Sequence, residues 1–232
     1  MIYTNTSKPN PGVQTFKVSA ICAVALSFGL LMISNAHAGG DTAVSWERVY
    51  WTWNDNKVQG HSKLIRSEGG LKAKIETRGL GKFNAFTLWF VVFNNPDACA
   101  TDPCTVADLE IPDAQGDFLY GGGIVTSGGF TRFSGKLDAG DSSGSGFPEI
   151  GAPPEAAIGL TNPMGADVLL AIHSHGPATS GATLKSQVSS FAGGCLPPFL
   201  GDAFGWAEGR SDIPRVEGEC STLQVSTHEA RD

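Results

Sequence analysis

The sequence predicts an all-β fold, an antiparallel β-sandwich or barrel-like sheet with long Gly/Pro-rich loops and two disulfides. No stretch keeps the 3.6-residue apolar period of a helix, whereas several short stretches have the alternation or the aromatic and β-branched content of strands. Turn residues separate these stretches, and the 232 residues include 30 glycines and 13 prolines. Many short strands between turns are typical of sandwiches and barrels.

Residues 1–38 are predicted to be a secretory signal peptide. Lys8 and Lys17 are the only charged residues in this stretch, an apolar run follows at 20–33, and Ala36-His37-Ala38 forms a small-x-small cleavage site. A buried core helix is the alternative for the apolar run, which is shorter than the roughly 20 residues that span a bilayer. We therefore expect cleavage near Ala38, a secreted or periplasmic protein, and no membrane span in the mature chain.

The rest of the chain, residues 39–232, is predicted to be one domain with an irregular C-terminal tail. Residues 71–77 alternate strictly between apolar and charged, which is typical of an antiparallel strand with one solvated face. Residues 85–93 are apolar except for Thr87 and predict a central strand covered on both faces, which Pro96 helps to end. Further strands are expected at 45–53, 117–125, 129–137, 166–173 and 187–191, with a hairpin turn at 126–129, a surface loop at 138–154 and the tail at 193–214.

The charge excludes one class of partner. The net charge is −7, and without the two leader lysines it becomes −9. A nucleic-acid-binding protein needs a basic face to meet phosphates, so we expect no nucleic-acid partner. The imbalance is uneven, because residues 39–82 hold eight Lys/Arg against five Asp/Glu and the rest of the chain holds six against 18. This distribution favours solubility outside the cell over attraction to anionic membranes.

Four cysteines remain after the leader, and an even number in an exported protein favours two disulfides. We expect the local pairs Cys99–Cys104, across the turn-forming Asp102-Pro103, and Cys195–Cys220, which would staple the Pro/Gly-rich tail. A metal site is the weaker interpretation of these cysteines, because no Cys-x-x-Cys occurs and no histidine neighbours them in sequence.

The histidines at the end of the 166–173 strand form the most specific candidate site. His173 and His175 are two residues apart, so an extended backbone would place both on one face, where they could bind Cu or Zn. Such a metal needs further ligands, for which His61 and Asp167 are candidates. The alternative is a strand end whose histidines simply bond to loop backbone.

Two other features are weaker. Trp51 and Trp53 share one strand face and could stack a sugar, although tryptophans at strand spacing more often belong to the core. Residues 140–144 (GDSSG) resemble the nucleophile loop of trypsin-like serine proteases, but Ser143 replaces a glycine of that loop and the family's histidine segment is missing around His61.

Two segments carry a resemblance to known proteins. Residues 85–96 with Cys99, and residues 165–178 (GADVLLAIHSHGPA), resemble a group of uncharacterised exported bacterial β-sandwich proteins. The His-x-His-Gly-Pro element within the second segment is also similar to the chordin-type CHRD domain. This resemblance implies an extracellular β-sandwich without established catalysis, and it implies neither a metal nor site residues.

We therefore expect an exported binding or structural module whose ligand the sequence does not name. The alternative is a Cu- or Zn-binding protein, or a metal-dependent enzyme, built on His173 and His175 with His61. The sequence does not decide whether the protein is an enzyme.

Overall fold

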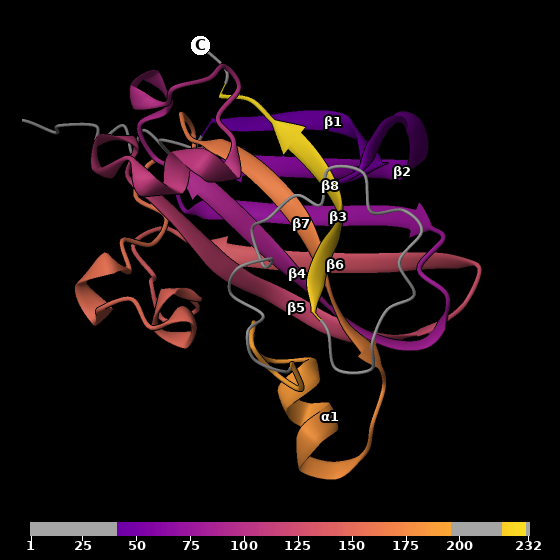
Figure 1. Cartoon of the computed structure of the whole chain (residues 1–232). Coiled ribbons are helices and arrows are strands. Elements are labelled where there is room, and N and C mark those ends of the chain that lie inside the picture. The colour runs from indigo at the N-terminus through magenta and orange to yellow at the C-terminus, as the bar shows by residue number, and fades with distance from the viewer. Residues whose placement is uncertain (1–40, 196–219, 231–232) are drawn as a thin grey trace, which may run out of the picture. The chain divides into compact units, whose positions relative to one another are not determined.

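One antiparallel sheet of eight strands forms the protein, seen here in a computed structural model (Figure 1). The structure describes residues 41–195 and 220–230. The strands are β1 Thr42–Trp51, β2 Asn54–Ser67, β3 Gly70–Arg78, β4 Lys82–Phe93, β5 Gly116–Ser127, β6 Phe130–Asp138, β7 Asp167–Pro177 and β8 Ser221–His228. Their order in the sheet is β5-β4-β7-β8-β1-β2-β3-β6. The predicted all-β fold is thus confirmed, in its barrel-like form.

The two edge strands, β5 and β6, nearly close the sheet into a barrel. A Cβ atom on Gly135 would lie 2.8 Å from the carbonyl oxygen of Gly121 and 2.7 Å from the ring of Phe90, so only glycine permits this approach. The β5–β6 turn contains Gly128 and Gly129 at φ 87° and 72°. Positive φ at both central residues is the requirement of the tight hairpin turn that the sequence predicted.

Six of the predicted strands are present, each within a few residues of its expected limits, and three differences remain. The strands β2 and β8 were not predicted. The strand expected at 187–191 is wrong, because the helix α1 (Gly181–Gln187) and a turn occupy this region. The predicted leader and most of the 193–214 tail lie outside the described residues.

The predicted central strand, β4, is covered on both faces. Its residues Phe86, Leu88, Phe90 and Val92 fill the barrel interior together with apolar side chains of the other strands. On the outer face, Trp89, Val91 and Phe93 pack beneath the 94–115 loop, which contains the short 3-10 helices η1 Pro96–Ala98, η2 Val106–Glu110 and η3 Pro112–Ala114. Two further 3-10 turns, η4 Phe147–Ile150 and η5 Pro154–Ala156, lie in the loop before β7. Burial of both faces explains why the strand is apolar at every position from 88 to 93.

A polar stripe crosses the barrel interior between β1, β2 and β8. The ring of His228 is fully buried, with Nδ1 2.7 Å from Ser45 Oγ and Nε2 2.8 Å from Ser62 Oγ. Arg66 is 1% exposed, and its guanidinium donates hydrogen bonds to the carbonyl oxygens of Pro163, Ala166, His228 and Glu229. These bonds tie the end of β8 to β2 and to the loop before β7.

Both predicted disulfides are present. Cys99 and Cys104 close a five-residue separation within the 94–115 loop, and Cys195 and Cys220 join the end of the α1 loop to the start of β8. No helix in the two described ranges is long and apolar enough to cross a membrane.

Candidate functional site

The end of β7 carries two buried histidines side by side. β7 lies between β4 and β8, so it is flanked on both edges. Ile172 points into the barrel core, and the alternation of the strand places His173 and His175 on the outer face, as predicted. Their ring centroids are 5.0 Å apart at an interplanar angle of 76°, and neither residue is more than 1% exposed.

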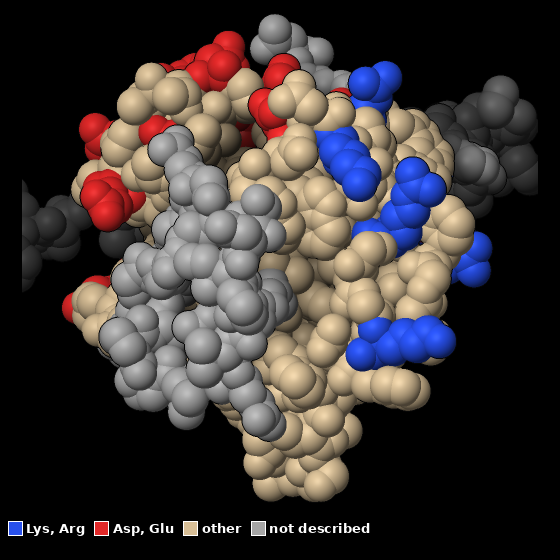
Figure 2. Space-filling model, turned by 45° about the vertical axis from the view of Figure 1, so that its right-hand side comes forward, with Lys and Arg blue, Asp and Glu red and all other residues tan. Residues whose placement is uncertain are grey.

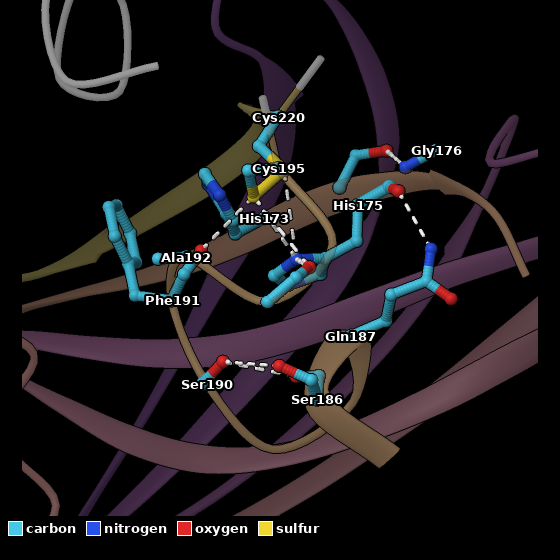
Figure 3. The surroundings of a disulfide bond; sticks show 12 residues. His173, His175, Gly176, Ser186, Gln187, Ser190, Phe191, Ala192, Cys195 and Cys220 are labelled. Atoms are coloured by element: carbon cyan, nitrogen blue, oxygen red, sulfur yellow. Dashed lines mark hydrogen bonds between the residues drawn. A yellow bond between two sulfur atoms is a disulfide. The ribbon is translucent and has the colours of Figure 1, made fainter. Parts of the chain in front are cut away.

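The Cys195–Cys220 disulfide lies directly on these histidines (Figure 3). Nδ1 of His175 is 3.7 Å from Cys195 Sγ and 3.8 Å from Cys220 Sγ. One donor atom from each of His173, His175, Cys195 and Cys220 lies within 4.8 Å of all the others, and we call these four residues the His/Cys cluster. Sequence reasoning paired the cysteines correctly but did not place them beside the histidines.

The register of β8 explains this convergence. Ser221 pairs with Ser174, the residue between the two histidines, so Cys220 enters the site one residue before the strand begins. Cys195 arrives from the other side, at the end of the loop that follows α1. Gln187, the last residue of α1, anchors that loop to β7 by donating to the carbonyl oxygens of His175 and Pro177.

His175 is held in one tautomer by a chain of buried hydrogen bonds. Nδ1 lies 2.8 Å from the carbonyl oxygen of Gly193, and because a carbonyl only accepts, Nδ1 carries the proton. Nε2 therefore accepts from the hydroxyl of Thr87, at 2.8 Å, and that hydroxyl accepts from the indole N–H of Trp89. Burial lowers the pKa of His175 from 6.5 to about 4, so the ring is neutral at pH 7.

His173 is fixed by packing and by a hydroxyl. Its ring stacks on that of Phe191, with centroids 4.3 Å apart and an interplanar angle of 21°. Nδ1 lies 3.3 Å from Thr222 Oγ1 on β8. Phe191 in turn contacts Trp89 and Phe118 edge-on, so the site continues into the apolar cluster on the outer face of β4.

The other predicted ligands do not join the cluster. His61 is exposed on β2, where Nε2 is 3.8 Å from a carboxylate oxygen of Glu76 and the ring lies beside Trp46. Asp167 begins β7, six residues before His173, and its carboxylate accepts from the backbone N–H groups of Cys104 and Ala230. In the described residues, His61 and Asp167 therefore have structural partners away from the His/Cys cluster.

Trp51 is the last residue of β1 and Trp53 lies in the β1–β2 turn. Their rings stack on each other, with centroids 4.6 Å apart, and both are half-buried against the barrel core. Sugar binding by this pair stays a prediction. The GDSSG loop forms a turn in which Asp141 accepts from the backbone N–H of Ser143.

Comparisons with protein-family models, with curated proteins and with solved structures give no match to this chain. The chemistry of the site is therefore argued from its own residues. Two imidazoles and two sulfurs are a donor set that suits Zn²⁺ and Cu⁺ in proteins, and in the oxidised form the sulfurs are bonded to each other.

Proposed function

We propose that this chain is an exported domain that binds a soft metal ion, Zn²⁺ or Cu⁺, at the His/Cys cluster once the Cys195–Cys220 disulfide is reduced. The observation that carries the proposal is the convergence of all four donor atoms within 4.8 Å. The two disulfides support export, because such bonds form and persist in oxidising compartments.

The spacing of the donors fits a tetrahedral ion. With Zn–S near 2.3 Å and Zn–N near 2.05 Å, a tetrahedral site needs sulfur-to-nitrogen distances of about 3.6 Å. Nδ1 of His175 already lies 3.7 and 3.8 Å from the two sulfurs. His175 and the two sulfurs thus fit a tetrahedral ion once the sulfurs separate to about 3.8 Å, which breaking the disulfide permits. His173 completes the donor set within the 4.8 Å that spans the cluster.

A second group of residues supports His175 as a ligand. A metal-bound imidazole usually donates its other N–H to a hydrogen-bond acceptor, which fixes the ring. Thr87 Oγ1 is 2.8 Å from Nε2, and a hydroxyl can accept as well as donate. When an ion takes Nδ1, the proton moves to Nε2 and Thr87 accepts from it. The contact between Nδ1 and Gly193 is then given up.

The redox step balances with a dithiol reductant, either an exported dithiol protein or a small dithiol. The reductant supplies two electrons and two protons and becomes a disulfide, while Cys195 and Cys220 become thiols. Binding of Zn²⁺ then releases two protons as both thiols become thiolates. The disulfide is therefore the closed, metal-free form of the site and the dithiol is the metal-binding form.

The free energies involved favour metal binding once the Cys195–Cys220 disulfide is reduced. A disulfide across 25 residues stabilises the fold by about 3.5 kcal/mol in the chain-entropy account. Structural Zn²⁺ bound by four protein ligands contributes roughly 10–16 kcal/mol in small peptides. The ion thus more than replaces the lost cross-link.

Cobalt absorption tests the proposal, because Co²⁺ substitutes for Zn²⁺ and reports both tetrahedral geometry and thiolate ligation. The protein is titrated with Co²⁺ before and after treatment with a phosphine reductant. We expect thiolate-to-cobalt charge-transfer bands at one Co²⁺ per chain only in the reduced protein, and displacement of Co²⁺ by Zn²⁺. Replacing His173 by Ala should weaken binding about tenfold or more, because one of four ligands is lost.

The second disulfide provides the matched control. Paired Cys99→Ser and Cys104→Ser substitutions should leave the cobalt spectrum unchanged, whereas paired Cys195→Ser and Cys220→Ser substitutions should remove the thiolate bands. Equal cobalt binding by the oxidised protein, or thiolate bands that depend on Cys99 and Cys104, would refute the proposal.

A further inference from the structure

Two exposed phenylalanines lie at one end of the barrel. Phe83 is the second residue of β4, just after the β3–β4 turn, and Phe130 is the first residue of β6, just after the β5–β6 turn; each is 71% exposed. The register places both turns at the same end, because Lys82 pairs with Ser127 and Arg78 pairs with Phe130. Large apolar side chains this exposed at one end of a barrel are candidates for an interaction surface.

Phe83 is also held in an unfavourable backbone conformation. Its φ is 58°, in the left-handed region that bulky residues avoid. The β4 strand bulges here, and hydrogen bonds fix the bulge: Ala178 N–H donates to the Phe83 carbonyl, and Thr126 Oγ1 bonds to the backbone of Asn84. Strained residues of this kind persist where the surrounding structure fixes them, and they cluster at functional sites.

The charge around the two rings is positive. Residues 78–84 (RGLGKFN) and 125–132 (VTSGGFTR) contain Arg78, Lys82 and Arg132 and no carboxylate. Arg132 reaches back to Glu76 on β3. Figure 2 shows Lys and Arg side chains along one side of the molecule and Asp and Glu mainly on another, although the chain as a whole is acidic.

The same basic character extends along the outer face of β3 and its neighbours. Lys74 lies directly opposite Lys63 on β2, and Lys72 lies directly opposite Lys136 on β6. Like charges in directly opposed positions destabilise a sheet. The Lys136–Asp138 salt bridge relieves part of this charge. Lys72 and Lys74 lie six and four residues along β3 from Arg78, so they extend the basic face away from the two phenylalanines.

We propose that this end of the barrel, which we call the Phe83/Phe130 tip, docks on a phospholipid bilayer that contains anionic lipids. The two rings insert among the headgroups, while Arg78 and Lys82 meet the lipid phosphates. This combination of exposed aromatic side chains with adjoining cations is how peripheral proteins bind an anionic interface. The two rings lie at the ends of two separate strands. A fluid lipid surface can accommodate both, because it does not require a complementary protein shape. The acidic remainder of the domain is repelled, so docking has one orientation.

Vesicle cosedimentation of the purified exported protein tests this proposal. We expect binding to phosphatidylcholine vesicles that contain phosphatidylglycerol, weaker binding to phosphatidylcholine alone, and loss of the difference at high salt. The paired substitutions Phe83→Asn and Phe130→Ser should lower binding about tenfold or more, because both insertable rings are lost. Asparagine tolerates positive φ, so the bulge is preserved.

Two further variants keep the result interpretable. Phe130→Ser alone leaves the strained backbone untouched and should lower binding by itself. Trp46→Ser removes a different exposed aromatic, 58% exposed on the outer face of β1, and should leave binding unchanged. The proposal is overturned if the wild-type protein does not bind the anionic vesicles, if the double variant binds as well as wild type, or if Trp46→Ser lowers binding equally.

Discussion

His175 makes the disulfide-bonded fold sensitive to acid. Its pKa is lowered from 6.5 to about 4, chiefly because burial disfavours the charged ring. The folded protein therefore binds fewer protons than the unfolded chain between these two values. The stabilisation is fully present above pH 6.5 and is lost as the pH falls toward 4.

The size of the effect follows from the two pKa values. For a site with pKa 6.5 in the unfolded chain and about 4 in the fold, stability falls by about 2 kcal/mol between pH 7 and pH 5. The total loss below pH 4 approaches about 3 kcal/mol. Against the 5–15 kcal/mol that is typical of domains, this is a large fraction.

Urea denaturation at pH 7 and pH 5 measures the loss, and His175→Gln provides the reference. Glutamine can accept from Thr87 and donate to Gly193, but it does not titrate. The difference in unfolding free energy between the two pH values should be about 2 kcal/mol larger for wild type than for the variant. Comparing wild type with the variant over the same pH change also cancels the contributions of carboxyl groups. One of these is Asp117, whose pKa is raised by burial. If wild type and variant lose the same stability, His175 is not the acid-sensitive group.

Three further outcomes are expected in urea denaturation at neutral pH. Thr87→Val should destabilise by about 2–5 kcal/mol, because it leaves the Trp89 N–H and the His175 ring nitrogen buried without their partner, whereas Thr87→Ser should retain most of the stability. Arg66→Met should cost at least about 3 kcal/mol by stranding the carbonyl oxygens that the guanidinium satisfies, and a smaller effect would show that water replaces it. Gly135→Ala should destabilise by about 1–3 kcal/mol through the clash at the barrel closure, and an unchanged midpoint would contradict the close approach.

The sequence was most informative where burial is simple. The alternation in β3 and the continuous apolar run in β4 follow directly from having one or two faces packed on apolar partners. The strands β2 and β8 were missed because most of their buried residues are polar, although Leu64 and Leu223 also contribute to the core. Ser62 and Arg66 of β2, like Gln224, Ser226 and His228 of β8, point into the polar stripe, so neither strand shows an apolar period.

Because β8 was not predicted, the sequence also did not bring the Cys195–Cys220 disulfide to the two histidines. Strand periodicity correctly placed His173 and His175 on one face, and spacing correctly paired Cys195 with Cys220. Their meeting depends on the pairing of Ser174 with Ser221, a register that requires β8. No local pattern encodes such a register, because the partners of its polar residues lie far away in the chain.

The place of β8 in the sheet also sets when the fold can form. β8 lies between β7 and β1. Ser45 on β1 and His228 on β8 are hydrogen-bonded although they are 183 residues apart in sequence. Until residues 221–228 have been synthesised, β7 and β1 each lack one of their neighbouring strands. Contacts of such long range are slow to form. The sheet can therefore close between β7 and β1 only after the strand at residues 221–228 has been made.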